Sequence, residues 1–222
     1  MQAAIRDLPD GGRVLDAACG IGIDALALHR RGFRVTGSDA SAAMVDQCRA
    51  RLDAEGVEVP VVTCAWADLP GRFAAEFDAV LCCGNSLAHA PTPDARRGAL
   101  VGFAGVLVEH GALLLDSQDW RLVHERGSHR DDDPQVVTRD GRRATRHYDW
   151  RVPARFGEPI TLVLTLVVRD GDREQVRRHA MTFCPFTADE LVADLEACGF
   201  AAVEVLQNPG DDRQTVLARR SP

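Results

Sequence analysis

Short β-rich runs alternate with helical segments through the first half of the chain. Such alternation is typical of a parallel sheet whose strands are joined by crossover helices. Ser41 can cap a helix that continues to Leu52, and Thr92-Pro93 can begin one that continues to Val108. The expected strands are Arg13–Ala18, Phe33–Ser38, Val59–Cys64, Phe77–Cys83 and Ala112–Ser117. We therefore predict an α/β fold with a mostly parallel sheet.

The chain changes character after Asp116. Turn-forming residues at Arg139–Arg142 and Arg169–Asp172 separate stretches of alternating polarity, which predicts two antiparallel hairpins. We expect them to form an antiparallel insertion at about 118–183, within a single domain that covers 1–222.

The C-terminal segment contains one more helix and two strands. Thr187-Ala188-Asp189-Glu190 is a capping box, and the helix that follows is expected to end near Gly199. The runs Ala202–Leu206 and Gln214–Ala218 then predict an antiparallel hairpin at the edge of the main sheet.

The composition of the chain argues against several classes of binding partner. The 222 residues have a formal net charge of -7, so a nucleic-acid partner is not expected. No basic segment followed by an apolar run opens the sequence, and no eighteen apolar residues occur in succession, so we expect no membrane partner and a cytoplasmic location. The seven cysteines lack C-x-x-C spacing and are read as reduced, mostly buried thiols, with no metal site expected. The sequence leaves a homo-oligomer open.

An acid and a glycine turn follow the first expected strand. Asp16 ends that strand, and Gly20 and Gly22 lie in the turn before a helix, where the backbone can approach a ligand. A loose dinucleotide fingerprint over 20–25 also fits, but the Asp16 carboxylate would repel a pyrophosphate and attract an ammonium group. Asp39 ends the second strand, where a carboxylate can bind both ribose hydroxyls. These positions favour S-adenosylmethionine over NAD and an oxidoreductase.

The loop after the third strand completes this series. Asp68 can meet an adenine amino group while Trp66 or Leu69 packs on the ring. In these features the sequence resembles the class I S-adenosylmethionine-dependent methyltransferases, a resemblance that implies a Rossmann-like sheet and a methyl-transfer reaction. The alternative for the three acids is that they cap loops or helices. The expected cofactor-binding residues are Asp16, Ala18, Gly20, Gly22, Asp39, Ala40, Trp66, Ala67, Asp68, Cys83 and Gly84.

The loop after the fourth strand carries three candidates for the methyl-acceptor side, Asn85, Ser86 and His89. The run 84–89, Gly-Asn-Ser-Leu-Ala-His, resembles the corresponding loop of glycine and sarcosine N-methyltransferases. That resemblance implies a substrate contact for Asn85, and His89 can be a second polar contact or a general base. Tyr148, the only tyrosine, can offer its hydroxyl or a ring beside the sulfonium. The competing interpretations are a left-handed turn residue for Asn85, and packing for His89 and Tyr148.

One departure from that branch bears on the acceptor. Gln118 stands where the resemblance implies a carboxylate-binding arginine, so the predicted function is methylation of a small-molecule amine other than glycine. An O-methyltransferase remains an alternative, with His89 as base or a divalent cation held by Asp116 and Asp119. A noncatalytic S-adenosylmethionine-binding partner subunit is another, because only twelve residues precede the first expected strand.

Overall fold

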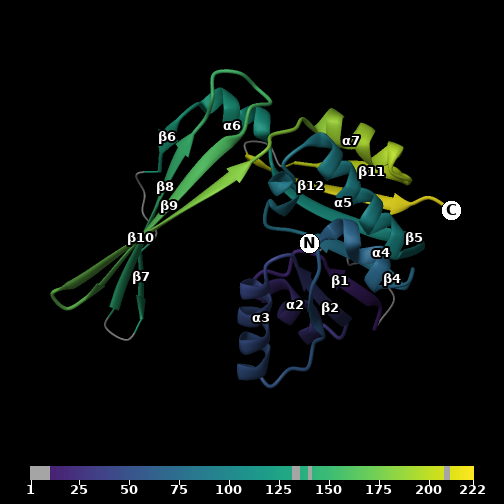
Figure 1. Ribbon diagram of the computed structural model, residues 1–222, viewed down its shortest axis with the longest axis horizontal. Helices are drawn as coiled ribbons and strands as arrows, with labels where there is room; N and C mark the ends of the chain where they lie inside the picture. The colour runs from purple at the N-terminus through teal and green to yellow at the C-terminus, as the bar shows by residue number, and fades with distance from the viewer. Residues whose placement is uncertain (1–10, 132–135, 140–141, 208–210) are drawn as a thin grey trace. The chain divides into compact units, whose positions relative to one another are not determined.

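The computed structural model describes residues 11–131, 136–139, 142–207 and 211–222, and these form two compact units (Figure 1). The first unit joins the residues up to Gln118 to Ala188–Pro222. The second unit is Asp119–Thr187. In the described part of the chain, no helix has both the length and the apolar character needed to cross a bilayer.

A seven-stranded sheet organises the first unit, in the order β11-β12-β5-β4-β1-β2-β3. The neighbouring strands from β5 to β3 pair in parallel, whereas β12 is antiparallel to both β5 and β11. This confirms the predicted α/β fold and its antiparallel C-terminal hairpin. The strands are β1 (Arg13–Asp16), β2 (Arg34–Asp39), β3 (Val61–Thr63), β4 (Phe77–Cys82), β5 (Leu107–Gln118), β11 (Phe200–Leu206) and β12 (Arg213–Arg220).

Side-chain caps begin two of the helices of this unit. The Ser41 hydroxyl accepts a hydrogen bond from the Met44 amide, and the Thr92 hydroxyl accepts one from the Ala95 amide, as the sequence predicted. The helical segments are α2 (Ile23–Arg30), α3 (Ala42–Ala54), the 3₁₀ turn η1 (Trp66–Asp68), α4 (Leu69–Arg72), the 3₁₀ turn η2 (Ser86–His89), α5 (Pro93–Val106) and α7 (Ala188–Ala197).

The junction between α5 and β5 differs from the expectation. The helix ends at Val106, not Val108, and the strand begins at Leu107, not Ala112. Leu107 pairs with Phe77 of β4, and the register then shifts past His110, which has a left-handed φ of 61°. The helix therefore ends earlier than its composition indicates, because the following residues pair with β4. This pairing cannot be inferred from the local sequence.

The core of the first unit follows the alternation of side chains along the strands. On one face, Val14 and Leu81 pack with Ala25 and Leu28 of α2 in a single apolar cluster. The strand residues that alternate with that set, including Leu15, lie on the opposite face and are also buried. Burial on both faces is the arrangement expected for a parallel sheet covered by helices.

The second unit is an antiparallel sheet with one helix. Its order is β10-β9-β8-β6, and β7 also pairs with β8. The hairpins β7–β8 and β9–β10 confirm the two predicted ones, although residues 140 and 141 of the first turn lie outside the described residues. The elements are α6 (Trp120–Arg126), β6 (His129–Arg130), β7 (Val136–Arg139), β8 (Arg142–Arg151), β9 (Ile160–Asp170) and β10 (Arg173–Phe183).

Helix α6 was not expected from the sequence. The Asp119 carboxylate caps it by accepting hydrogen bonds from the amides of Arg121 and Leu122. Aromatic packing holds the core of this unit, with the Phe183 ring centroid 5.2 Å from that of Trp120 and 6.2 Å from that of Trp150.

Candidate functional site

Loops that follow four parallel strands surround one cavity. The carboxyl ends of parallel strands share one edge of a sheet, which is where ligands bind in open α/β folds. A cavity of about 300 Å³ lies among the loops that follow β1, β2, β3 and β4. Its lining residues are Ala17, Ala18, Asp39, Ala40, Ala65, Trp66, Ser86 and His89.

Asp16 lies immediately before the two alanines that line the cavity. Only 2% of the residue is exposed, and its Oδ2 atom is buried without a hydrogen-bond partner among the described residues. Burial, reinforced by the nearby charge of Asp24, raises the pKa of Asp16 to about 7. A carboxylate in this state gains from a bound cation that also donates hydrogen bonds.

The glycine turn connects Asp16 to the second acid. The Gly20 amide donates to Oδ2 of Asp39 at 3.0 Å, which ties the loop after β1 to the end of β2. Gly22 occupies the N-cap position of α2 with φ 81°, and a Cβ atom there would lie 2.7 Å from the Cys48 sulfur. A side chain at this position would therefore be both strained and crowded, which explains the glycine.

Asp39 faces the cavity from the end of β2. Its Oδ1 accepts a hydrogen bond from the Ser41 amide at 2.9 Å, while Oδ2 accepts the one from Gly20. A carboxylate has about four acceptor positions, so two remain for a ligand. Ala40 beside it leaves space at the cavity wall.

Trp66 also lines the cavity. Its indole N–H donates to the Ala17 carbonyl at 2.7 Å, and its ring meets Phe103 edge-on with centroids 6.0 Å apart. Helix α5 can lie against this turn because residue 102 is a glycine. A Cβ atom at this position would be only 2.0 Å from the Trp66 carbonyl oxygen. The indole is thus fixed in place before any ligand arrives.

Ala67 and Asp68 do not line this cavity. Both are exposed, and both border a separate open hollow beside Cys64 and Arg72. The predicted contacts of Asp68 with adenine and of Ala67 with the cofactor stay predictions.

Asn85 lies in the loop after β4 and is hydrogen-bonded to the end of β5. Its backbone is left-handed, with φ 66°, and its amide donates to Oδ1 of Asp116 at 2.9 Å. Its buried side-chain oxygen accepts hydrogen bonds from the Gln118 amide at 2.9 Å and from the Ser117 hydroxyl at 3.3 Å. Asn85 is therefore a left-handed turn residue that also hydrogen-bonds the loop after β4 to the end of β5. Its contact with substrate stays a prediction.

The rest of this loop borders the cavity. His89 is exposed on η2 and lines the cavity with Ser86, whose hydroxyl donates to the Cys83 carbonyl at 2.6 Å. Gly84 has a left-handed φ of 74°. Burial raises the pKa of the Cys83 thiol well above its usual range, so the sulfur stays protonated and is a poor nucleophile.

Part of the sequence is similar to proteins of known function. Residues 14–111 match the family model described as a methyltransferase domain. The chain is 33% identical over 115 residues to the glycine/sarcosine N-methyltransferase of Aphanothece halophytica. Over this stretch the chain is similar to known methyltransferases.

The match to the curated relatives is partial. It covers 52% of this chain and 43% of the Aphanothece enzyme, and the human glycine N-methyltransferase has the same coverage at 33% identity over 128 residues. The chain therefore spans less than half the length of these relatives.

Solved structures extend the similarity of fold to the whole chain. DesVI of Streptomyces venezuelae has a TM-score of 0.84 at 21% identity, with 99% of this chain and 88% of DesVI covered. The sugar N-methyltransferase KedS8 of a Streptoalloteichus species has a TM-score of 0.77 at 22% identity, with 100% and 85% covered. At these identities the likeness establishes the fold alone.

Tyr148 belongs to the second unit of the protein. It lies on β8, where the Arg146 guanidinium is 5.7 Å from the centre of its ring. Its role toward substrate stays a prediction.

The acids considered for a divalent cation have other partners. Asp116 forms an ion pair with Arg213 at 2.7 Å and accepts the Asn85 amide, while Asp119 caps α6. Among the described residues there is no group of three or more His, Cys, Asp or Glu side chains that could hold a metal ion.

Two lining residues were missed by sequence reasoning. Ala17 and Ala65 each precede a residue that was predicted, and both contribute to the cavity wall. Their small size was the available signal, because a ligand that approaches the backbone needs small residues after the strand ends.

Proposed function

We propose that this protein transfers a methyl group from S-adenosylmethionine to the nitrogen of a small-molecule acceptor other than glycine. The buried, unpartnered carboxylate oxygen of Asp16 is the observation that carries the proposal. A buried acceptor atom without a donor is costly, and an ammonium group supplies both the donor and the opposite charge. A pyrophosphate at the same place would add a like charge.

The residues around the cavity fit the parts of this cofactor. Asp16 would bind the methionyl ammonium group, Asp39 would accept from the ribose hydroxyls, and Trp66 would pack on the base. S-adenosylmethionine, when bound, supplies a methyl group that is already activated by the positive charge of its sulfur.

The protein then has to align the acceptor and exclude water. An amine that enters in its neutral form presents a lone pair directly, so the site needs no strong base. His89 lies on the cavity wall, where its imidazole can orient the acceptor or take the proton that the amine releases.

Gln118 disfavours glycine as the acceptor. A neutral amide offers neither the positive charge nor the two-pronged geometry with which an arginine binds a carboxylate. Arg213 lies opposite Gln118 in the β12–β5 pair, but its guanidinium is already engaged by Asp116. The curated relatives are named glycine or sarcosine N-methyltransferases, whereas solved structures of similar fold include a sugar N-methyltransferase and an amino pentose methyltransferase.

The test is a screen with methyl-labelled S-adenosylmethionine. The acceptors are glycine, sarcosine, uncharged and aromatic amines and phenols, and mass spectrometry identifies the methylated atom. We expect an N-methylated amine as the best product and a kcat/KM for glycine roughly ten- to a hundredfold lower, the effect of one lost charge-assisted contact. Glycine as the best acceptor would contradict the proposal.

The same screen separates the alternatives. The position of His89 on the cavity wall favours O-methylation as the second candidate, which predicts a phenol ether as product and its loss in His89→Ala. Inhibition by a chelator would indicate a divalent cation. Binding of S-adenosylhomocysteine without turnover of any acceptor would indicate a noncatalytic binding subunit.

A further inference from the structure

Gln118 ends β5 with an unused hydrogen-bond acceptor. Its side-chain Oε1 atom is buried and has no hydrogen-bond partner among the described residues. Most buried polar side-chain atoms in proteins have a partner, so an exception next to a ligand edge requires an explanation. The carboxyl end of β5 lies on the same edge of the sheet as the ends of β4 and β1, because these strands are parallel.

The backbone around this side chain is held firmly. The Gln118 amide donates to the Asn85 side-chain oxygen at 2.9 Å, and the Gln118 carbonyl accepts from the Gln214 side chain at 3.5 Å. Both backbone groups of Gln118 therefore have partners. The side-chain oxygen has no such partner among the described residues, so a ligand that donates to it would displace no hydrogen bond of the protein.

The charges beside Gln118 determine what kind of ligand group fits. Asp116 lies two residues earlier on β5 and so shares a face of the strand with Gln118. Its Oδ2 atom pairs with Arg213 at 2.7 Å, and its Oδ1 atom accepts the Asn85 amide. The carboxylate and the guanidinium neutralise each other, so an anionic ligand group would meet the oxygen of Gln118 without a free positive charge. A neutral group that donates a hydrogen bond would satisfy that oxygen.

We propose that Gln118 is a specificity-determining residue whose Oε1 atom accepts a hydrogen bond from the methyl acceptor. The acceptor class is then an amine that carries a hydroxyl or second N–H group near the nucleophilic nitrogen, a hydroxylated amine in the simplest case. This inference rests on the proposed N-methyltransferase function and adds the chemistry of the acceptor to it.

Matched pairs of amines test the inference in the unmodified protein. The probes are 2-aminocyclohexanol against cyclohexylamine and 2-aminoethanol against ethylamine, each with methyl-labelled S-adenosylmethionine. A site with a buried acceptor atom discriminates strongly against an analogue that lacks the donor, so we expect kcat/KM to favour the hydroxylated member by at least about tenfold. Equal or reversed preference would overturn the role of Gln118.

Three variants assign the preference to the oxygen atom. Gln118→Met removes the acceptor at similar length, and the preference should fall toward one. Gln118→Glu keeps a hydrogen-bond acceptor at the same position and should retain the preference for the hydroxylated amine. Gln47→Met makes the same change at an exposed glutamine of α3 and should behave as the unmodified protein.

Calorimetry with S-adenosylhomocysteine tests the proposed function separately from the role of Gln118. Failure of the unmodified protein to bind this ligand would overturn the proposed function and the inference with it. Normal binding without discrimination between paired amines, including the case in which neither is methylated, would overturn the inference about Gln118 alone. Loss of the preference in Gln118→Met with unchanged ligand affinity would support it.

Discussion

Asp16 combines a buried position with a carboxyl group that must be charged to bind an ammonium ion. Its pKa of about 7 lies far above the usual value of 3.8, mainly because burial disfavours the charged form. The native state therefore binds a proton that the unfolded state has released between about pH 4 and pH 7. Because the folded pKa is raised, this group destabilises the ligand-free protein increasingly as the pH rises through that window.

The same shift predicts a pH dependence of ligand binding. At pH 6 most Asp16 side chains are protonated and must release a proton to receive the ammonium group, whereas at pH 8 most are already charged. The dissociation constant of S-adenosylhomocysteine should therefore be roughly tenfold higher at pH 6 than at pH 8. Titration calorimetry in two buffers of different ionisation enthalpy measures both the affinity and the released proton.

Asp16→Asn provides the control for this prediction. The variant has no carboxylate to titrate, so its affinity should be weaker at pH 8 and nearly independent of pH. A variant that retained the full pH dependence would assign the titration to another group.

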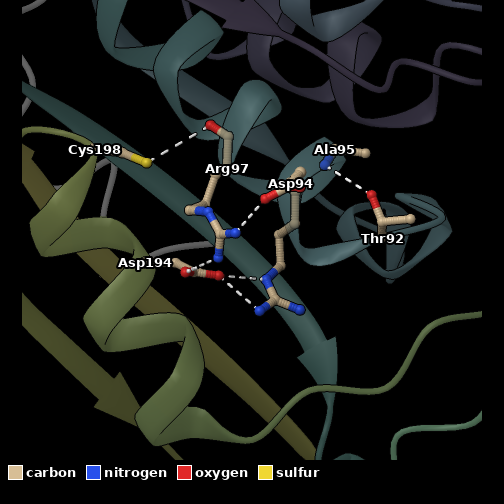
Figure 2. A network of polar contacts seen from close by, with 7 residues as sticks. Thr92, Asp94, Ala95, Arg97, Asp194 and Cys198 are labelled. Atoms are coloured by element: carbon tan, nitrogen blue, oxygen red, sulfur yellow. Dashed lines mark hydrogen bonds and ion pairs between the residues drawn. The ribbon is translucent and has the colours of Figure 1, made fainter.

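At the scale of elements, one ion-pair network joins α5 to α7. Asp194 on α7 accepts hydrogen bonds from Arg96 at 2.7 Å and from Arg97 at 3.2 Å, and Figure 2 shows Asp194 facing Arg97 across the two helices. The side chains of Arg96 and Asp194 are only 8% and 11% exposed. The Cys198 sulfur also donates to the Arg97 carbonyl at 3.6 Å, so α7 is tied to α5 at two places.

Removing the shared acid should destabilise the protein strongly. Asp194→Ala leaves the buried Arg96 charge without this partner, and breaking a buried pair in this way costs about 3–5 kcal/mol in the free energy of unfolding. Urea denaturation measures the change. Asp94→Ala is the matched control, because Asp94 is 90% exposed and pairs with Arg97 at the surface, where ion pairs contribute little. Equal effects of the two substitutions would refute this account of the network.

At the scale of the whole molecule, the cavity residues all belong to the first unit. A ligand in that cavity acts on the unfolding of this unit and raises its free energy of unfolding by mass action. At a hundredfold excess over its dissociation constant, S-adenosylhomocysteine should add about 2.7 kcal/mol. For a chain of this size that corresponds to a rise in Tm of roughly 5–10 °C in scanning calorimetry.

Substitution of Asp39 tests whether this stabilisation comes from the proposed site. Asp39→Ala removes charge-assisted hydrogen bonds, so the affinity should fall roughly tenfold or more, and the shift in Tm at the same ligand concentration should shrink. Asp46→Ala, at an exposed acid on α3, should preserve the shift. An undiminished shift in the Asp39→Ala protein would contradict its assignment to the ribose.

The order of the elements and most of the strand-end residues could be predicted from the sequence. The signals for these elements are local and can be recognised without knowledge of the fold. They are the strand and helix periodicities, the caps at Ser41 and Thr92, and the turns of the two hairpins. The acids at 16 and 39 were recognisable for the same reason, because each lies at the end of a strand-like run.

Tertiary structure alone decided the properties that depend on distant residues. The protonation of Asp16 results from burial and from Asp24 and Asp39, and the scaffold function of Asn85 depends on Gln118, 33 residues away. The early end of α5 depends on pairing with β4. The Gln118 side-chain oxygen is buried without a hydrogen-bond partner among the described residues because of the residues that surround it in space. Burial and hydrogen bonding sum over neighbours in space, whereas a sequence pattern reports only neighbours along the chain.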